Sequence, residues 1–458
     1  MDKNKRLVDS FFELEQEKQL FMLKKGKTFV WDPIRYFIFG KLVFGNDFYA
    51  KTGAKKEKKT PVYYLKIAIN LIQSTFKLLF KDYKYIFIIN SRYFDQATNS
   101  YYDRNFKDIL DCIRSESFVI ELNKNGISKS YLGPKRFFAF PFLLGIVRLL
   151  TPKRKPYSFQ NLTHILSSKF SIPEDLGKNE YYNSVLDEFE LLSNTLRFIF
   201  KLIKPKAVFY GQYGLKGCVK ACADLGIDSI EMQHGRTQLD HLFYSYPIGF
   251  ENIRQVYTPT HFLTYSDYWY STVNFPIAGD YVPVGNSEIC QSNGNQLVKT
   301  DSLLLIDGLI GHIELSDFLL KLLENGLEDE VIYKLHPDQF FEKAQIAEKY
   351  GKFKNVTVIS NKIPTPELVA KCKTVLLVQS TVAFEMLDSG GKCLILKALG
   401  HGMIEELFEH ENVFLIENQE DFQSAIQQPI VPQATEDKFF LPFNKALFMN
   451  WMEKKGFL

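Results

Sequence analysis

Cysteine is scarce in this sequence of 458 residues, and its six cysteines are scattered. None belongs to a Cys-x-x-Cys pair. Cys218 and Cys222 lie four residues apart in a helical pattern, but no second cluster completes a zinc site. Because disulfides are rare in reducing compartments, we expect buried, reduced thiols in a cytoplasmic protein.

Long hydrophobic runs are also missing. The longest uncharged apolar run, 137–147, is interrupted by Pro141 and covers only eleven residues. A membrane-crossing helix needs about 20 residues. The first residues, Met1 to Glu17, are charged throughout and lack the apolar centre of a signal peptide. We therefore expect no membrane-spanning segment.

The net charge is small, at +3, because 56 Lys and Arg residues offset 53 Asp and Glu residues. Nucleic-acid-binding proteins usually carry a strong basic excess, so we expect no nucleic-acid partner. Hydrophobic residues, in contrast, make up 46% of the chain and aromatic residues 15%. This composition excludes global disorder, and the length suits two or more domains with a large core.

Apolar runs that suit buried strands alternate with helical patterns along much of the chain. In the first half, they lie at 85–89, 118–120, 206–210 and 228–232. In the second half, they lie at 302–306, 330–335, 355–359, 374–378, 392–396 and 412–416. A stretch rich in Gly, Pro, Asn and Ser, 275–300, separates the halves. Strand–helix–strand units imply parallel sheets, so we expect an α/β fold of two doubly wound halves.

Chemically active side chains gather directly after several of these strands. The loops concerned are Gln233-His234-Gly235-Arg236, Asp307 to His312, His336-Pro337, and Gln379-Ser380-Thr381 with Glu385 in the following helix. Ligands of open α/β sheets bind outside the carboxyl ends of the strands. We therefore expect these loops to face one crevice.

Each group has a use if the ligand is a phosphate ester of a nucleotide. Gly308 and Gly311 would let the backbone approach a phosphate, and Ser380-Thr381 would cap a helix whose first N–H groups bind an anion. His336 would donate a hydrogen bond to the leaving phosphate. His234 would orient or deprotonate an acceptor hydroxyl. Taken singly, each motif is also an ordinary turn, helix cap or buried histidine.

Three motifs resemble those of bacterial GT-B glycosyltransferases of surface-polysaccharide synthesis, namely Gln233-His234-Gly235, Lys334-Leu335-His336-Pro337 and the segment from Gln379 to Glu385. Similar His-Pro and Ser-Ser/Thr motifs mark sialyl- and polysialyltransferases that use CMP-sugars. Similar Gln-His-Gly and His-Pro motifs occur in capsule Kdo transferases and in teichoic-acid polymerases that use CDP-glycerol. The resemblance covers roughly 205–400, and it implies a GT-B fold of two Rossmann-like domains facing a central cleft.

The resemblance implies that His336 and Ser380-Thr381 contact the donor and that a base lies in the first half or at the cleft. Together with the strand-end positions, it gives roles for single residues. The catalytic residues would be His234, Asp307 and His336. The donor would contact Gly308, Gly311, His312, Lys334, Pro337, Gln379, Ser380, Thr381 and Glu385, and the acceptor would contact Gln233, Gly235 and Arg236. The base is open between His234 and Asp307, since Ile306-Asp307-Gly308 only approximates the acidic-acidic-Gly motif of the sialyltransferases.

The activity that follows is an inverting transfer of a sugar from a nucleotide-sugar donor to a surface-glycan acceptor. A CMP donor carrying sialic acid, a related nonulosonic acid or Kdo is favoured. No Asp-x-Asp motif occurs, in keeping with chemistry that needs neither metal nor cofactor. CDP-polyol or UDP-hexose transfer, a nucleotide-sugar epimerase and an inert assembly subunit of the same fold are the alternatives.

The expected division of the chain is an N-terminal helical segment (1–60), an acceptor domain (61–275), a donor domain (285–430) and a helical tail (431–458). The helical pattern over 64–82 and the apolar segment 137–150, next to Lys153-Arg154-Lys155, suit either core packing or contact with anionic lipid. Lipid contact would place the protein at the inner face of the cytoplasmic membrane, beside a lipid-linked glycan.

Overall fold

The computed structural model describes residues 3–45, 61–80, 82–90, 93–95, 100–122, 136–137, 140–151, 156–172, 176, 179–211, 214–250, 253–290, 299–308, 310–360, 363–432 and 438–458. The charge run Lys55 to Lys59 and the basic cluster 153–155 lie outside the described residues. Two separate parallel sheets organise the chain, one in each half.

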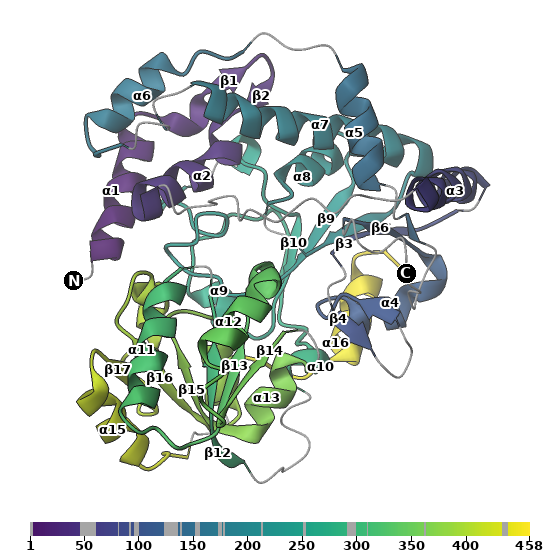
Figure 1. The fold of residues 1–458 in the computed structure, drawn as a ribbon. Coiled ribbons are helices and arrows are strands. Elements are labelled where there is room, and N and C mark those ends of the chain that lie inside the picture. The colour runs from purple at the N-terminus through teal and green to yellow at the C-terminus, as the bar shows by residue number, and fades with distance from the viewer. Residues whose placement is uncertain are drawn as a thin grey trace.

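Seven parallel strands form the first sheet, in the order β11-β10-β9-β8-β3-β6-β7 (Figure 1). They are β3 (Tyr85–Ile89), β6 (Ser117–Glu121), β7 (Arg136–Phe137), β8 (Ala207–Tyr210), β9 (Asp228–Met232), β10 (His261–Leu263) and β11 (Tyr281–Val282). All residues of β3 and β6 are buried, as expected for parallel strands covered on both faces. The four predicted strands of this half are confirmed, whereas β7, β10 and β11 were not predicted.

Helices of very different length surround this sheet. They are α3 (Pro61–Phe80), α4 (Lys107–Ile113), α5 (Phe140–Leu150), α7 (Asn179–Ile203) and α8 (Lys216–Ala223). A Cβ atom on Gly217 would lie 2.6 Å from the backbone oxygen of Phe189. Glycine at this position therefore allows α8 to approach α7 closely.

The N-terminal residues form a helical cap on the first domain. It contains α1 (Lys3–Glu17), α2 (Trp31–Phe44) and, from a later segment, α6 (Gln160–Ser167). An antiparallel hairpin of β1 (Lys24–Lys25) and β2 (Thr28–Phe29) separates α1 from α2, where the sequence had indicated only helix. The buried Arg35 guanidinium donates to Glu15 at 2.7 Å, and Asp32 of α2 pairs with Lys216 of α8 at 3.2 Å.

The second sheet has six parallel strands in the order β14-β13-β12-β15-β16-β17. They are β12 (Thr300–Ile306), β13 (Val331–Lys334), β14 (Val356–Ile359), β15 (Cys372–Leu377), β16 (Lys392–Leu396) and β17 (Val413–Ile416), and the helices are α11 (His312–Glu324), α12 (Lys343–Lys349), α13 (Thr365–Lys371), α14 (Val382–Asp388) and α15 (Gln419–Gln427). All six strands were predicted. The prediction of two Rossmann-like domains in a GT-B arrangement is confirmed.

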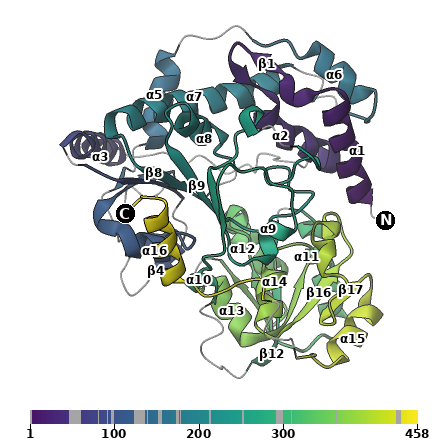
Figure 2. The same ribbon diagram turned by 180° about the vertical axis from the view of Figure 1, so that it is seen from behind.

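The end of the chain returns from the second domain to the first. Helix α16 (Lys445–Lys454) lies next to α4 (Figure 1), and Figure 2 shows α16 from behind. The Tyr85 hydroxyl donates to the backbone oxygen of Phe457 at 2.6 Å, and the indole nitrogen of Trp451 donates to Asp280 at 2.9 Å. The remaining elements are β4 (Tyr93–Asp95), β5 (Ser100–Tyr102), α9 (Tyr268–Ser271), α10 (Ser287–Cys290) and the short 3-10 turns, η1 (Leu20–Met22), η3 (Arg114–Glu116), η6 (Ile253–Gln255), η8 (Pro337–Glu342) and η9 (His401–Leu407).

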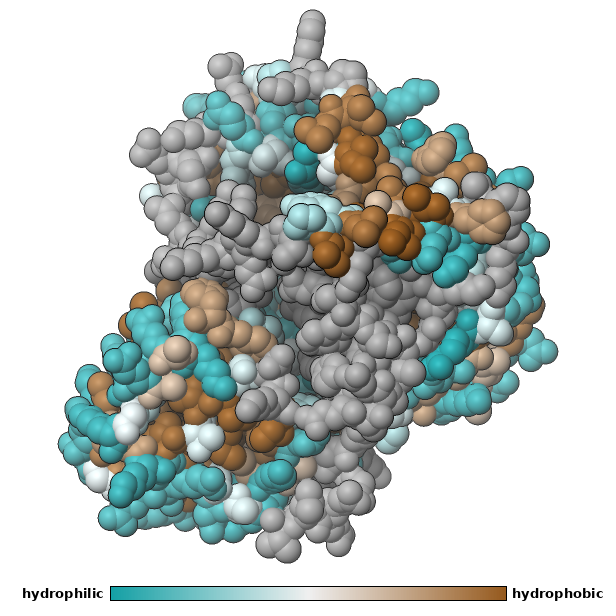
Figure 3. Space-filling model, turned by 45° about the vertical axis from the view of Figure 1, so that its right-hand side comes forward, coloured by the Kyte–Doolittle hydropathy of each residue, from teal (hydrophilic) through white to brown (hydrophobic). Residues whose placement is uncertain are grey.

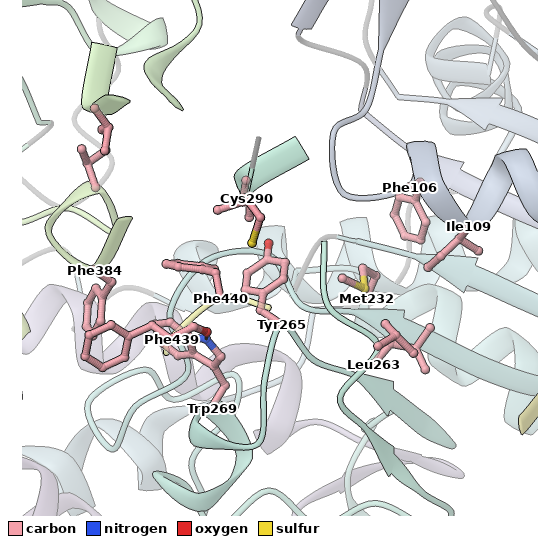
Figure 4. Packing of buried hydrophobic residues seen from close by; sticks show 14 of the residues in the cluster. Phe106, Ile109, Met232, Leu263, Tyr265, Trp269, Cys290, Phe384, Phe439 and Phe440 are labelled. Carbon is pink, nitrogen blue, oxygen red and sulfur yellow. Dashed lines mark hydrogen bonds between the residues drawn. The ribbon is translucent and has the colours of Figure 1, made fainter. Parts of the chain in front are cut away.

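One hydrophobic cluster spans both domains (Figure 4). Trp269 of α9 lies with its ring centroid 5.0 Å from that of Phe384 in α14 and 5.6 Å from that of Phe440. Its indole nitrogen donates to the backbone oxygen of Phe439 at 2.6 Å. Because aromatic burial of this kind contributes strongly to stability, the cluster fixes the two domains relative to each other.

Candidate functional site

The second sheet reverses its direction of growth between β12 and β15. Strands β13 and β14 add on one side of β12, whereas β15, β16 and β17 follow on the other. Such a switch point is where open α/β sheets bind ligands, outside the carboxyl ends of the strands. The loops after β12 and β15 therefore bound the candidate site in this domain.

Glycines allow these loops to pack closely. Gly311 and Gly400 both have positive φ angles, of 74° and 96°. A Cβ atom on Gly311 would lie 2.9 Å from the side chain of Val378, and one on Gly400 would lie 2.9 Å from that of Ile310. A Cβ atom on Gly308 would lie 3.5 Å from the Gln379 amide nitrogen. The glycines at 308 and 311 thus lie beside the loop after β15, as the strand-end argument predicted.

Asp307 lies at the carboxyl end of β12 with 3% of its surface exposed. Its carboxylate accepts from the Gly308 N–H at 3.0 Å and from the Tyr333 hydroxyl at 3.3 Å. Burial raises the pKa of Asp307 to about 7, and the two hydrogen bonds only partly oppose this rise. A carboxyl group with such a pKa exchanges its proton near neutral pH.

The loop after β15 joins the two domains at this site. The Ser380 hydroxyl accepts from the Val382 N–H at 3.2 Å, as at the start of many helices. The next residue, Thr381, lies against the first domain, since its methyl group would be 3.8 Å from a Cβ atom on Gly235. The Gln-His-Gly motif of one domain and the Gln-Ser-Thr motif of the other therefore meet.

His234 is held by a chain of hydrogen bonds within the first domain. Its Nδ1 atom lies 2.8 Å from the amide nitrogen of Asn105. The amide oxygen of Asn105 accepts from the Tyr265 hydroxyl at 2.9 Å. This arrangement makes Nδ1 of His234 the acceptor, so the neutral imidazole carries its proton on Nε2.

Glu385 is paired across the domain boundary. Arg104 of the first domain lies 3.7 Å from its Oε1 atom. The Glu385 side chain is buried, and its Oε2 atom has no hydrogen-bond partner among the described residues. Burial raises the pKa of Glu385, while Arg104 opposes the rise. A buried acceptor of this kind is suited to a ligand hydroxyl.

Arg104 and Asn105 are site residues that the sequence analysis missed. They belong to the triplet Asp103-Arg104-Asn105, which follows β5 and precedes α4. Asp103 anchors the triplet by accepting from the backbone N–H groups of Asn90 at 3.1 Å and Asn105 at 3.0 Å. The only signal in the sequence is three consecutive polar residues before a helix, because β5 belongs to a small hairpin rather than to the main sheet.

Three predicted ligand residues contact other parts of the chain. The Lys334 ammonium donates to the backbone oxygens of Ser360 and Ile363, and burial lowers its pKa to about 8. Gln233 accepts from the Tyr265 N–H at 2.9 Å and donates to the Gly235 oxygen at 2.8 Å.

Arg236, the third of these predicted ligand residues, donates to the Met403 oxygen of the second domain and to Asp240. These contacts of Lys334, Gln233 and Arg236 hold the loops of the site in place.

His336 and Pro337 follow β13, the neighbour of β12. The His336 carbonyl accepts from the Gln339 N–H at 2.9 Å, where Pro337 begins η8. His312 is the first residue of α11, directly after Gly311. All three lie at the carboxyl edge of the second sheet, as predicted from their place after strands.

The part of the chain that the structure describes shows neither a metal cluster nor a membrane-crossing helix. It contains no group of three or more His, Cys, Asp or Glu side chains arranged to hold a metal ion. No helix there has both the length and the apolar character needed to cross a bilayer. The six cysteines are unpaired, and all except the half-buried Cys112 are buried.

Comparison with known proteins gives likenesses of structure only. No protein family and no curated protein matches the sequence. The UDP-GlcNAc 2-epimerase of Methanocaldococcus jannaschii, in complex with UDP-GlcNAc and UDP, aligns with 82% of this chain and 99% of its own, at 12% identity and a TM-score of 0.49.

Two transferases align less closely. The trehalose 6-phosphate synthase of Burkholderia multivorans aligns with 76% of this chain and 90% of its own, at 10% identity and a TM-score of 0.42. The glycosyltransferase VinC, in complex with DTDP, aligns with 81% of this chain and 95% of its own, at 13% identity and a TM-score of 0.42. At such identities, the likeness concerns architecture and does not define a substrate.

Proposed function

We propose that this chain is an inverting, metal-independent glycosyltransferase that uses a nucleotide-sugar donor. The observation that carries the proposal is the meeting of Gly235 and Thr381 across the domain boundary. Thr381 lies beside the Gln-His-Gly loop of the first domain, and Gln379 of the same loop as Thr381 lies beside Gly308 of the second. A donor bound in one domain would thereby face an acceptor bound in the other.

The nucleotide would bind at the switch point of the second sheet. Gly308 and Gly311 lie at the carboxyl end of β12, beside Gln379 and Val378, and we place the phosphate at this edge because ligands of open α/β sheets bind there. Glu385, with its unpartnered buried oxygen, would accept hydrogen bonds from the ribose hydroxyls. Arg104 would supply a positive charge beside them. A CMP donor carrying a nonulosonic acid or Kdo, and a surface-glycan acceptor, are the finer part of this proposal.

Asp307 is the base in this proposal. Its raised pKa, about 7, lies near the operating pH that suits general-base catalysis. The acceptor oxygen attacks the anomeric carbon, its proton passes to Asp307, and the electron pair of the breaking bond goes to the nucleotide phosphate. His336, and His234 through its Nε2–H group, would stabilise the negative charge on that phosphate. One displacement inverts the anomeric centre.

Nucleotide release separates this function from its rivals. The purified chain would be incubated with CMP-, CDP-, UDP- and dTDP-activated sugars, with and without a glycan acceptor. We expect release of free nucleotide to rise with acceptor and to be greatest with a CMP-sugar. Conversion of the donor into an epimer without acceptor would show an epimerase, and no reaction with any donor would favour an inert subunit.

A further inference from the structure

Helix α3 presents its more apolar stripe to solvent. Leu65, Ile72 and Phe76 recur at helical spacing and are 60%, 70% and 62% exposed, whereas Ile67 and Ser74 face the protein and are buried. Helices of globular proteins normally turn their apolar stripe toward the core. The reversed orientation of α3 indicates a surface that contacts something other than the described part of the chain.

Two neighbouring helices extend this surface. On α5, Leu149 and Leu150 are 87% and 78% exposed, and α7 adds Phe198 and Leu202. An apolar groove of about 350 Å³ runs between the three helices, with Leu71, Leu143, Val147, Phe198 and Ile199 in its lining. We call these side chains the α3–α5–α7 surface. Figure 3 shows apolar side chains gathered on the upper part of this side of the molecule.

Helices α3 and α5 and the last part of α7 carry charges of one sign in the sequence. Helices α3 and α5 contain no Asp or Glu, but they contain Lys66, Lys77 and Arg148. The last twelve residues of α7, 192–203, likewise have no acidic residue and include two basic ones. The surface therefore combines apolar side chains with an excess of positive charge, although Arg148 pairs with Glu188 and Arg197 with Asp224.

We propose that the α3–α5–α7 surface docks the protein on a bilayer of anionic lipid. Apolar side chains enter the boundary between headgroups and acyl chains, while lysines and arginines contact the lipid phosphates. The groove offers room for part of one hydrocarbon chain. Such docking goes beyond the proposed glycosyl transfer and holds whether or not that transfer occurs, because it involves none of the residues of the candidate site.

Co-sedimentation with vesicles tests the proposal directly. The full chain would be mixed with vesicles of phosphatidylcholine and phosphatidylglycerol, or with vesicles of phosphatidylcholine alone. The variant is Ile72→Asp/Leu149→Asp. The matched control is Ile248→Asp, because Ile248 is 87% exposed like Leu149 but lies beside α1, where its carbonyl accepts from Gln16. Thermal melts check that all forms fold.

We expect the wild type and Ile248→Asp to bind the mixed vesicles, and to bind pure phosphatidylcholine more weakly. The double variant should lose at least about tenfold in affinity for the mixed vesicles, since charge opposes burial in the interface. The proposal is overturned if the wild type does not sediment with anionic vesicles, or if the double variant binds as well as the control. It is also overturned if the wild type is instead a dimer that the double variant dissociates.

Discussion

The two domains of this protein have the same sheet architecture, but they differ in how well their strands could be predicted from the sequence. In the second domain, strands and helices alternate at short intervals, and every strand from β12 to β17 was predicted. In the first domain, the short strand β7 and the helices α5, α6 and α7 lie between the end of β6 at Glu121 and the start of β8 at Ala207. The fold of the second domain, the proposed donor side, therefore follows from the local sequence pattern. The fold of the first domain depends more on long-range packing.

The domains also differ in what they bury. The first domain encloses ionisable side chains in its core, for instance Glu231, which accepts from the hydroxyls of Tyr210 and Tyr244 at 2.8 and 2.7 Å. The second domain places its buried carboxyls at edges, such as Asp307 after β12 and Asp388 at the end of α14. The buried carboxyl of Glu231 thus has a structural task, and that of Asp307 has, by our proposal, a chemical one.

The largest expected effect comes from Asp307→Asn, which removes the proposed base. We expect turnover to fall about 10²–10⁴-fold. In the wild type, activity should rise with pH through about 7 as Asp307 loses its proton, and the variant should lack this rise. A pH–rate profile of the purified forms checks both statements.

Asp388→Asn is the matched control for this change. Asp388 is also a buried aspartate of the second domain with its pKa raised to about 6, but it accepts from the backbone N–H groups of Phe439 and Phe440. We expect it to lower the melting temperature and to keep the rise in activity near pH 7. If it abolished that rise while Asp307→Asn preserved it, Asp307 would not be the base.

His336→Ala tests the other strand end of the second domain. Loss of one donor to the departing phosphate should lower turnover about 10²–10³-fold at saturating donor, with an unchanged thermal melt. His234→Ala should have an effect of the same size if both histidines stabilise the phosphate. Near-wild-type rates for His336→Ala would show that the His-Pro pair is only a turn.

Arg104→Met probes the contact between the domains. Without the guanidinium, the buried carboxyl of Glu385 loses its positive neighbour. Nucleotide binding should therefore weaken about tenfold, which corresponds to about 1.4 kcal/mol. Titration calorimetry with CMP measures this change. In a Glu385→Gln background, the same substitution should have a smaller effect, since the two side chains interact directly. Equal effects in both backgrounds would show that the pair is not coupled.

The smallest effect on turnover concerns Glu231 in the core of the first domain. Burial raises its folded-state pKa from 4.5 to about 7, so the folded protein binds more protons than the unfolded chain between these values. The free energy of unfolding should therefore fall as pH rises through this window, by about 1 kcal/mol per pH unit. Denaturant unfolding of Glu231→Gln at several pH values should show a flatter slope, with turnover unchanged.

Much of the site could be predicted because parallel strands bring their carboxyl ends to one edge. This geometry places Asp307, His336 and Ser380 along one sheet without any tertiary information. Arg104 and Asn105 escaped prediction because they reach the site from a loop after a two-stranded hairpin. The orientation of α3 could not be predicted either, since helical spacing shows which residues share a face but not what that face contacts.

A structure of the protein with bound CMP tests the central claim most directly. We expect the phosphate beside Gly308 and Ser380, the ribose at Glu385, and the nucleotide facing His234 of the first domain. Binding of CMP at another place on the chain, or the absence of binding by CMP, CDP and UDP alike, would contradict it.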